Sequence, residues 1–122
     1  MKRLACLLLL LPLLLCGGCA TLNPSADPLV VNSERTIAIA KETLNAFVSF
    51  EFNHRAKCPK EVQLAAETIR REAPAWFARA MKVKLAYKAN RGPDQKADLM
   101  TAVAVLSTAA SEAAVALAKH QR

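Results

Sequence analysis

Small and apolar residues recur at alternating spacings of four and three positions between Val62 and Tyr87. On an α-helix this spacing places them on one face, and it is typical of helices that pack side by side with interlocking side chains. The spacing continues without a slip across Pro74, although an internal proline lacks a hydrogen-bond donor and crowds the preceding turn. We therefore predict one long helix that is kinked or broken near Pro74. The positions, which we call the central seam, are Val62, Ala66, Ile69, Ala73, Trp76, Ala80, Val83 and Tyr87.

A second apolar row, Phe77, Met81 and Leu85, lies beside the central seam. The middle helix of a three-helix bundle contacts two neighbours, so it needs a wider apolar surface than one seam provides. We expect the other two helices to cover this row; the alternative is that it is exposed for a partner.

A similar pattern precedes the long helix. Asp27-Pro28 predicts a helix start, with the aspartate as N-cap and the proline in the first turn, although Asn32 or Ser33 would also serve. This first helix should end near Arg55, because Pro59 disfavours helical conformation in the residue before it. Its apolar positions are Val30, Ile37, Ala40, Leu44, Phe47 and Val48.

A third helical pattern runs from about Pro93 to Lys119 and is rich in alanine, whose small side chain allows helices to approach closely. We expect Gly92 to end the preceding helix in a left-handed conformation. Since Gly92 is the only glycine after residue 18 and aromatic residues are few, the composition favours helices over a sheet. The sequence thus predicts an all-α fold, an antiparallel three-helix bundle over residues 28–122. The apolar positions of the third helix are Leu99, Val103, Leu106, Ala110, Ala113 and Leu117.

The chain begins with a basic pair, Lys2 and Arg3, followed by an apolar run from Leu4 to Leu15. As a helix rising about 1.5 Å per residue, this run would span about 18 Å, well short of a bilayer core of about 30 Å. It has the form of a secretory signal peptide rather than of a membrane span.

The run is followed by Cys16-Gly17-Gly18-Cys19, and this segment resembles the lipobox of bacterial lipoproteins. Cys16 stands where the family usually has leucine, and Leu15 lies one place too early. The resemblance covers residues 1–20 only. It implies that residues 1–18 are removed and that Cys19 carries a covalent lipid. Residues 19–27 would then be a lipidated N-terminus and tether, and no other cofactor is expected.

The same resemblance implies a location. In such lipoproteins the residue after the lipidated cysteine helps to select the membrane, and Ala20 in place of an aspartate implies the outer membrane, facing the periplasm, if the host is diderm. The alternative is an ordinary signal peptide cut after Ala20, which would release a secreted soluble helical protein. In the processed lipoprotein Cys58 would be the one unmodified cysteine, so no disulfide framework is expected.

Basic residues are concentrated between Arg70 and Arg91, where Glu72 is the single acidic residue. They are candidates for contact with anionic lipid or an anionic envelope polymer, and a solvated basic face is the alternative interpretation. Loss of Lys2 and Arg3 would lower the net charge from +7 to +5. We do not expect an exported chain to bind nucleic acid. The candidates are Arg70, Arg71, Arg79, Lys82, Lys84, Lys88 and Arg91.

Glu51, His54 and Cys58 would share one helical face if the first helix continued that far. A Glu-x-x-His pair can form half of a carboxylate-bridged metal site, but such sites need a second pair, and His120 lies near the C-terminus. We therefore interpret the segment as a polar helix end with a small apolar cysteine at the turn. The chain has no nucleotide-binding loop, HExxH zinc pattern or GxSxG elbow.

These features lead us to expect a non-enzymatic binding or structural module of the cell envelope, anchored to the membrane. Its partner would be another envelope protein or anionic surface material. A phage or mobile-element lipoprotein that acts in lysis or exclusion is the alternative.

Overall fold

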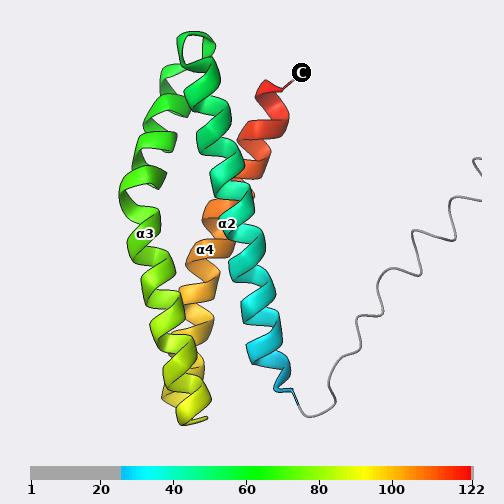
Figure 1. The fold of residues 1–122 in the computed structure, drawn as a ribbon, viewed down its shortest axis with the longest axis vertical. Helices are drawn as coiled ribbons and strands as arrows, with labels where there is room; N and C mark the ends of the chain where they lie inside the picture. The colour runs from blue at the N-terminus through cyan, green and yellow to red at the C-terminus, as the bar shows by residue number, and fades with distance from the viewer. Residues whose placement is uncertain (1–25, 122) are drawn as a thin grey trace, which may run out of the picture.

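The computed structural model describes residues 26–121, which form a bundle of three long helices (Figure 1). The helices are α2 (Pro28–His54), α3 (Lys60–Ala89) and α4 (Pro93–His120), and a short 3-10 helix, η2 (Arg55–Lys57), follows α2. Successive helices run in opposite directions, and each long helix contacts both others. The predicted all-α, antiparallel three-helix bundle is confirmed. The predicted signal peptide, Cys19 and most of the tether lie outside the described residues.

The start of α2 is the one predicted from Asp27 and Pro28. Asp27 accepts a hydrogen bond from the backbone N–H of Leu29 at 2.9 Å, so it satisfies one of the unpaired donors of the first turn. The alternative starts at Asn32 and Ser33 are wrong. Ser33 is buried inside the helix, and its hydroxyl donates to the carbonyl of Leu29 at 2.7 Å.

The connection between α2 and α3 is short and well bonded. Pro59 precedes the first residue of α3, which agrees with the predicted boundary. The side-chain amide of Gln63 donates to the carbonyls of Arg55 and Cys58 at 3.1 and 2.9 Å. These bonds tie the first turn of α3 to η2 and to Cys58, the residue that follows η2.

Pro74 lies inside α3, and the helix continues through it. Of the two predicted outcomes, the continuous helix is therefore the observed one. Because Pro74 cannot donate to the carbonyl of Arg70, the helix loses one internal hydrogen bond there. In this region α3 bows outward from the bundle (Figure 1).

The conformation predicted for Gly92 is wrong. Its φ and ψ are −76° and 163°, and no residue in 26–121 has a positive φ. The helix α3 already ends at Ala89, and Asn90 leaves it in an extended conformation. Gly92 instead precedes α4 as its N-cap, extended because the following Pro93 disfavours helical conformation in the residue before it.

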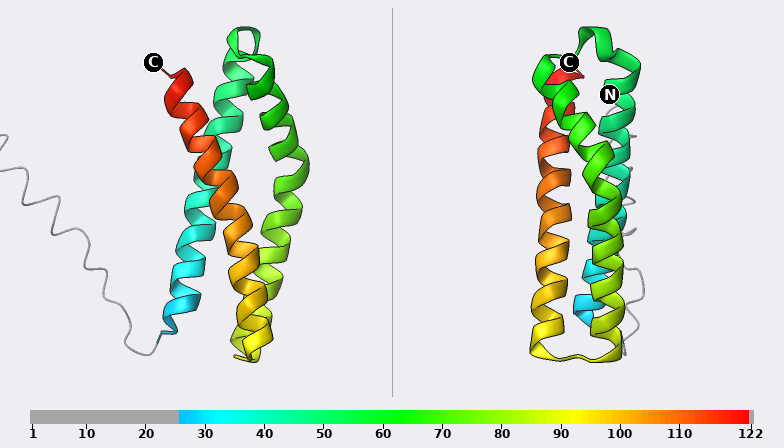
Figure 2. Two further views of the ribbon diagram at one scale, coloured as in Figure 1. Left: turned by 180° about the vertical axis from the view of Figure 1, so that it is seen from behind. Right: turned by 90° about the vertical axis from the view of Figure 1, so that its left-hand side faces the viewer.

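The core is built largely from alanine. Ala66 and Ala80 are fully buried on the central seam, and Leu44, Phe47 and Leu106 fill the space between the helices. Every residue of the central seam is buried or partly buried, as its spacing predicts. Small side chains allow the helix axes to approach closely. In Figure 2, α4 starts beside the end of α3 and diverges from it toward the C-terminus.

The second apolar row of α3 is only partly covered. Phe77 packs against the core, as expected. Met81 and Leu85 are 43% and 60% exposed, so the prediction that the other helices cover them is wrong. The helices α2 and α4 therefore do not extend around α3 as far as these two positions.

Candidate membrane-contact surface

Four of the seven basic candidates on and after α3 are paired with carboxylates of the protein itself. Arg71 bonds Glu72 at 2.9 Å, and Arg70 bonds the buried carboxylate of Glu51. The other two pairs are Lys84 with Glu34 at 3.1 Å and Arg91 with Asp27 at 3.6 Å. The seven residues therefore do not all present an unpaired charge at the surface.

Lys84 was expected to contact an external anion at the surface, and of the seven candidates it differs most from that expectation. The residue is only 8% exposed, and its ammonium donates to Glu34 on α2. Its carbon stem packs in the bundle while the charge reaches a carboxylate at the edge, as long basic side chains often do. Lys84 holds α3 to α2 and is not available to an external anion.

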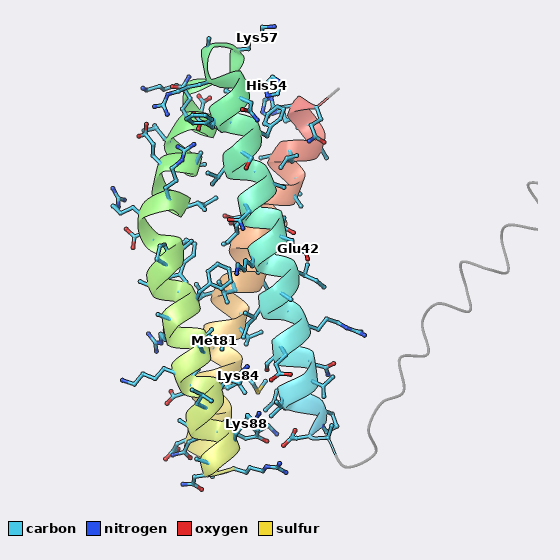
Figure 3. The ribbon with its side chains drawn as sticks, viewed as in Figure 1. Glu42, His54, Lys57, Met81, Lys84 and Lys88 are labelled. Atoms are coloured by element: carbon cyan, nitrogen blue, oxygen red, sulfur yellow. The ribbon has the colours of Figure 1, made fainter. Side chains whose placement is uncertain are left out.

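Arg79, Lys82 and Lys88 are exposed and have no ion pair with another residue in 26–121. Lys82 and Lys88 alternate along the helix with the exposed Met81 and Leu85. These four residues, which we call the α3 end surface, combine apolar side chains with positive charge. Figure 3 shows Met81 and Lys88 on the half of α3 that leads to its C-terminus.

Asp27, which precedes the first residue of α2, contacts the C-terminal end of α3. The hydroxyl of Tyr87 donates to Asp27 at 2.9 Å, and Arg91 lies 3.6 Å from the same carboxylate oxygen. Asp27, the residue that precedes α2, therefore lies beside Tyr87 and Arg91. This contact places Asp27 and the α3 end surface at the same end of the molecule.

The contacts of Asp27 change its acidity. The backbone N–H of Leu29 lowers the pKa of this carboxyl most, and the Tyr87 hydroxyl lowers it further. The same hydrogen bond raises the pKa of Tyr87, because ionised tyrosine would face the carboxylate without a proton to donate. The contact is therefore strongest when Asp27 is ionised and Tyr87 is protonated.

Glu51 lies in the last turn of α2, as predicted, but it is fully buried and is not part of a solvent-exposed polar end. Arg70 reaches it from α3, and Arg55 lies 3.3 Å from its other oxygen. The spacing of Ala40, Leu44, Phe47 and Glu51 is four, three and four, so the signal for burial was present in the sequence.

The other two members of the candidate metal group are also engaged elsewhere. The His54 ring stacks on Phe50 and bonds the Phe50 carbonyl at 2.9 Å, and Cys58 is buried against the core. Within residues 26–121, no three His, Cys, Asp or Glu side chains are placed to hold a metal ion.

The outer face of α4 is unusually free of charge. Glu112 is the single charged residue between Leu99 and Ala118, and Met100 and Val115 are 54% and 69% exposed. By length and composition α4 is apolar enough to cross a membrane, a property it shares with the core helices of many proteins. It is the one helix in residues 26–121 with that property.

Comparison of the chain with protein-family models, curated proteins and solved structures finds no match.

Proposed function

We propose that this protein is a non-enzymatic, lipid-anchored module of the cell envelope that rests on an anionic membrane through the α3 end surface. The observation that carries the proposal is the contact between Asp27 and Tyr87 at 2.9 Å. It brings Asp27, where the proposed tether would join α2, to the same end of the bundle as the exposed Lys82 and Lys88. In a diderm host, Ala20 favours the periplasmic face of the outer membrane.

The length of the tether sets the distance between the bundle and the membrane. Residues 21–27 span about 20 Å when extended at about 3.1 Å per residue. Charge attraction to a membrane fades over about 8 Å in physiological salt, so a slack tether lets the α3 end surface reach the region where attraction acts.

The exposed side chains of this surface suit a lipid headgroup layer. Lys82 and Lys88 each gain about 1 kcal/mol near an anionic membrane, and Met81 and Leu85 supply apolar area that the bundle leaves uncovered. The lipid on Cys19 would hold the protein on the membrane. The α3 end surface would set its orientation there.

The anchor is tested by metabolic labelling with radioactive palmitate. We expect label in the wild type and in Cys58→Ala, and none in Cys19→Ala. Equal label in Cys19→Ala would show that the lipid is not on Cys19, and absence of label from all three would favour the secreted form cut after Ala20.

The orientation is tested by adsorption of the processed chain carrying Cys19→Ser to vesicles with and without anionic lipid. Reversal of both charges in Lys82→Glu/Lys88→Glu should weaken adsorption to anionic vesicles at least about tenfold, because each lysine contributes about 1 kcal/mol. The matched control is Lys57→Glu/Lys60→Glu, which makes the same charge change at the opposite end. Equal losses in the two variants would contradict a specific contact surface.

A further inference from the structure

A cleft of about 220 Å³ lies between α3 and α4, away from the α3 end surface. Phe47, Ile69 and Trp76 form its large apolar walls, and Ala113 lines it from α4. Thr68 and Glu112 supply its polar groups. The cleft therefore joins an apolar interior to one carboxylate.

The cleft exists because small side chains face a bowed helix. Pro74 lies in the middle of α3, which bows away from the bundle there (Figure 1). On the opposite wall α4 presents alanines, among them Ala109 and Ala113, which are too short to fill the added space. The side chains that line such a space have no packing partners on that side. A ligand of matching shape would supply these van der Waals contacts.

The charge at the cleft is opposite to that of the chain as a whole, which carries +7. Glu112 is exposed and has no ion pair with another residue in 26–121. Glu72 lies one helical turn from both Thr68 and Trp76, on the same side of α3, and its carboxylate bonds Arg71. No basic residue lines the cleft. The local charge thus favours a cation.

Trp76 adds a second preference for a cation. It is partly buried, lines the cleft and packs against two of the core clusters. The face of an indole ring attracts cations, and tryptophan is the most effective aromatic residue for this contact.

We propose that this cleft binds a small organic cation with an apolar body, such as an arylalkylammonium ion. The apolar body lies against Phe47, Ile69 and Trp76, and the ammonium group faces Glu112. The size is sufficient, since an apolar cavity of about 150 Å³ is known to bind benzene. The inference concerns a different face from the membrane contact and does not depend on lipidation.

The test uses the processed chain in vesicles of neutral phosphatidylcholine, with phenethylammonium as the probe. Trp76 is the chain's one tryptophan, so its emission reports on the cleft directly. Two probes of similar shape serve as controls, namely neutral 2-phenylethanol and anionic phenylacetate. We expect saturable binding, with the cation about five- to tenfold tighter than the neutral probe and the anion weakest, as a cation contact of about 1 kcal/mol requires.

Variants identify the groups responsible. Glu112→Gln should reduce the preference for the cation over the neutral probe by at least about twofold, leaving the part that Trp76 supplies, and the matched Glu42→Gln on α2 should leave the preference unchanged. Ala109→Leu should abolish binding of all three probes by filling the cleft, with the helical circular dichroism retained. Equal affinity for the three probes in the wild type, or an unchanged preference in Glu112→Gln, overturns the proposal even if Ala109→Leu fails to fold.

Discussion

Arg70 of α3 bonds the carboxylate of Glu51 on α2, and that carboxylate is completely shielded from solvent. Arg70 also donates to the carbonyl of Val48 at 3.3 Å. Arg55 lies 3.3 Å from the second oxygen of Glu51 and bonds Glu67 on α3 at 2.6 Å. This network ties α2 to α3 at the end of the bundle opposite Asp27.

Removal of the guanidinium should leave a buried carboxylate with one remaining, half-exposed partner. We expect Arg70→Met to lower the free energy of unfolding by about 2 kcal/mol, somewhat below the usual loss for a buried pair because Arg55 remains. The double variant Glu51→Leu/Arg70→Met should recover most of the loss, since both charges are gone. Urea unfolding followed by circular dichroism measures both values.

The control for this prediction is Arg71→Met. Arg71 pairs with Glu72 at the surface, where an ion pair contributes less than about 1 kcal/mol. A loss in Arg70→Met no larger than that in Arg71→Met would mean that the buried pair does not stabilise the bundle.

The Asp27 contact predicts a specific dependence of stability on pH. Because folding lowers the pKa of this carboxyl from its usual 3.8, its contribution is complete above that value and is lost as the pH falls through the lowered pKa. Asp27→Asn keeps a good N-cap residue but removes the charge. Its urea midpoint should therefore fall less between pH 5 and pH 2.5 than that of the wild type.

The matched variant for the pH measurement is Asp98→Asn. Asp98 is an exposed carboxylate with no ion pair in residues 26–121. Its acid profile should follow that of the wild type. Identical profiles for Asp27→Asn and Asp98→Asn would show that the contacts of the ionised Asp27 carboxylate, with the Leu29 N–H, Tyr87 and Arg91, contribute no stability that depends on pH.

The helices themselves could be predicted from the sequence because periodic apolar positions determine which face is buried. The buried charged residues also occupy positions of this spacing. They are not recognised as buried because charged residue types are expected at the surface. Glu51 continues the spacing of Leu44 and Phe47, and Lys84 follows Ala80 by four positions. Such residues are expected at the surface unless a partner is known, and each partner here lies on another helix.

The errors at Met81, Leu85 and Gly92 have a different origin. The exposure of Met81 and Leu85 depends on how far α2 and α4 extend around α3. The sequence pattern of α3 alone does not determine that extent. At Gly92 the influence of Pro93 on the preceding residue outweighs the preference of glycine for a left-handed helix end. The cleft beside Trp76 was also not predicted, because it depends on the bow of α3 relative to α4.

The fully buried alanines predict where the bundle tolerates no added volume. Ala80 has no exposed surface and packs against the cluster that contains Ala40 and Leu106. Ala80→Leu should lower the free energy of unfolding by about 1 to 3 kcal/mol because the helices must move apart. Ala78→Leu, at an exposed position of the same helix, should change it by less than about 0.5 kcal/mol. Similar values for the two would contradict close packing at Ala80.

Pro74 links the shape of α3 to the cleft, so its replacement should change both stability and binding. Alanine restores the N–H that bonds the carbonyl of Arg70 and allows α3 to straighten toward α4. We expect Pro74→Ala to raise the free energy of unfolding by about 1 to 2 kcal/mol. This raises the melting temperature of a domain this size by several degrees, at about 4 to 8 °C per kcal/mol.

The same change narrows the space beside Trp76. Its emission maximum should move to shorter wavelength, and phenethylammonium should bind at least about fivefold more weakly, as the loss of about 1 kcal/mol of contact implies. Stabilisation without either change at Trp76 would show that the cleft owes its size to the alanines of α4 alone and not to the bow at Pro74.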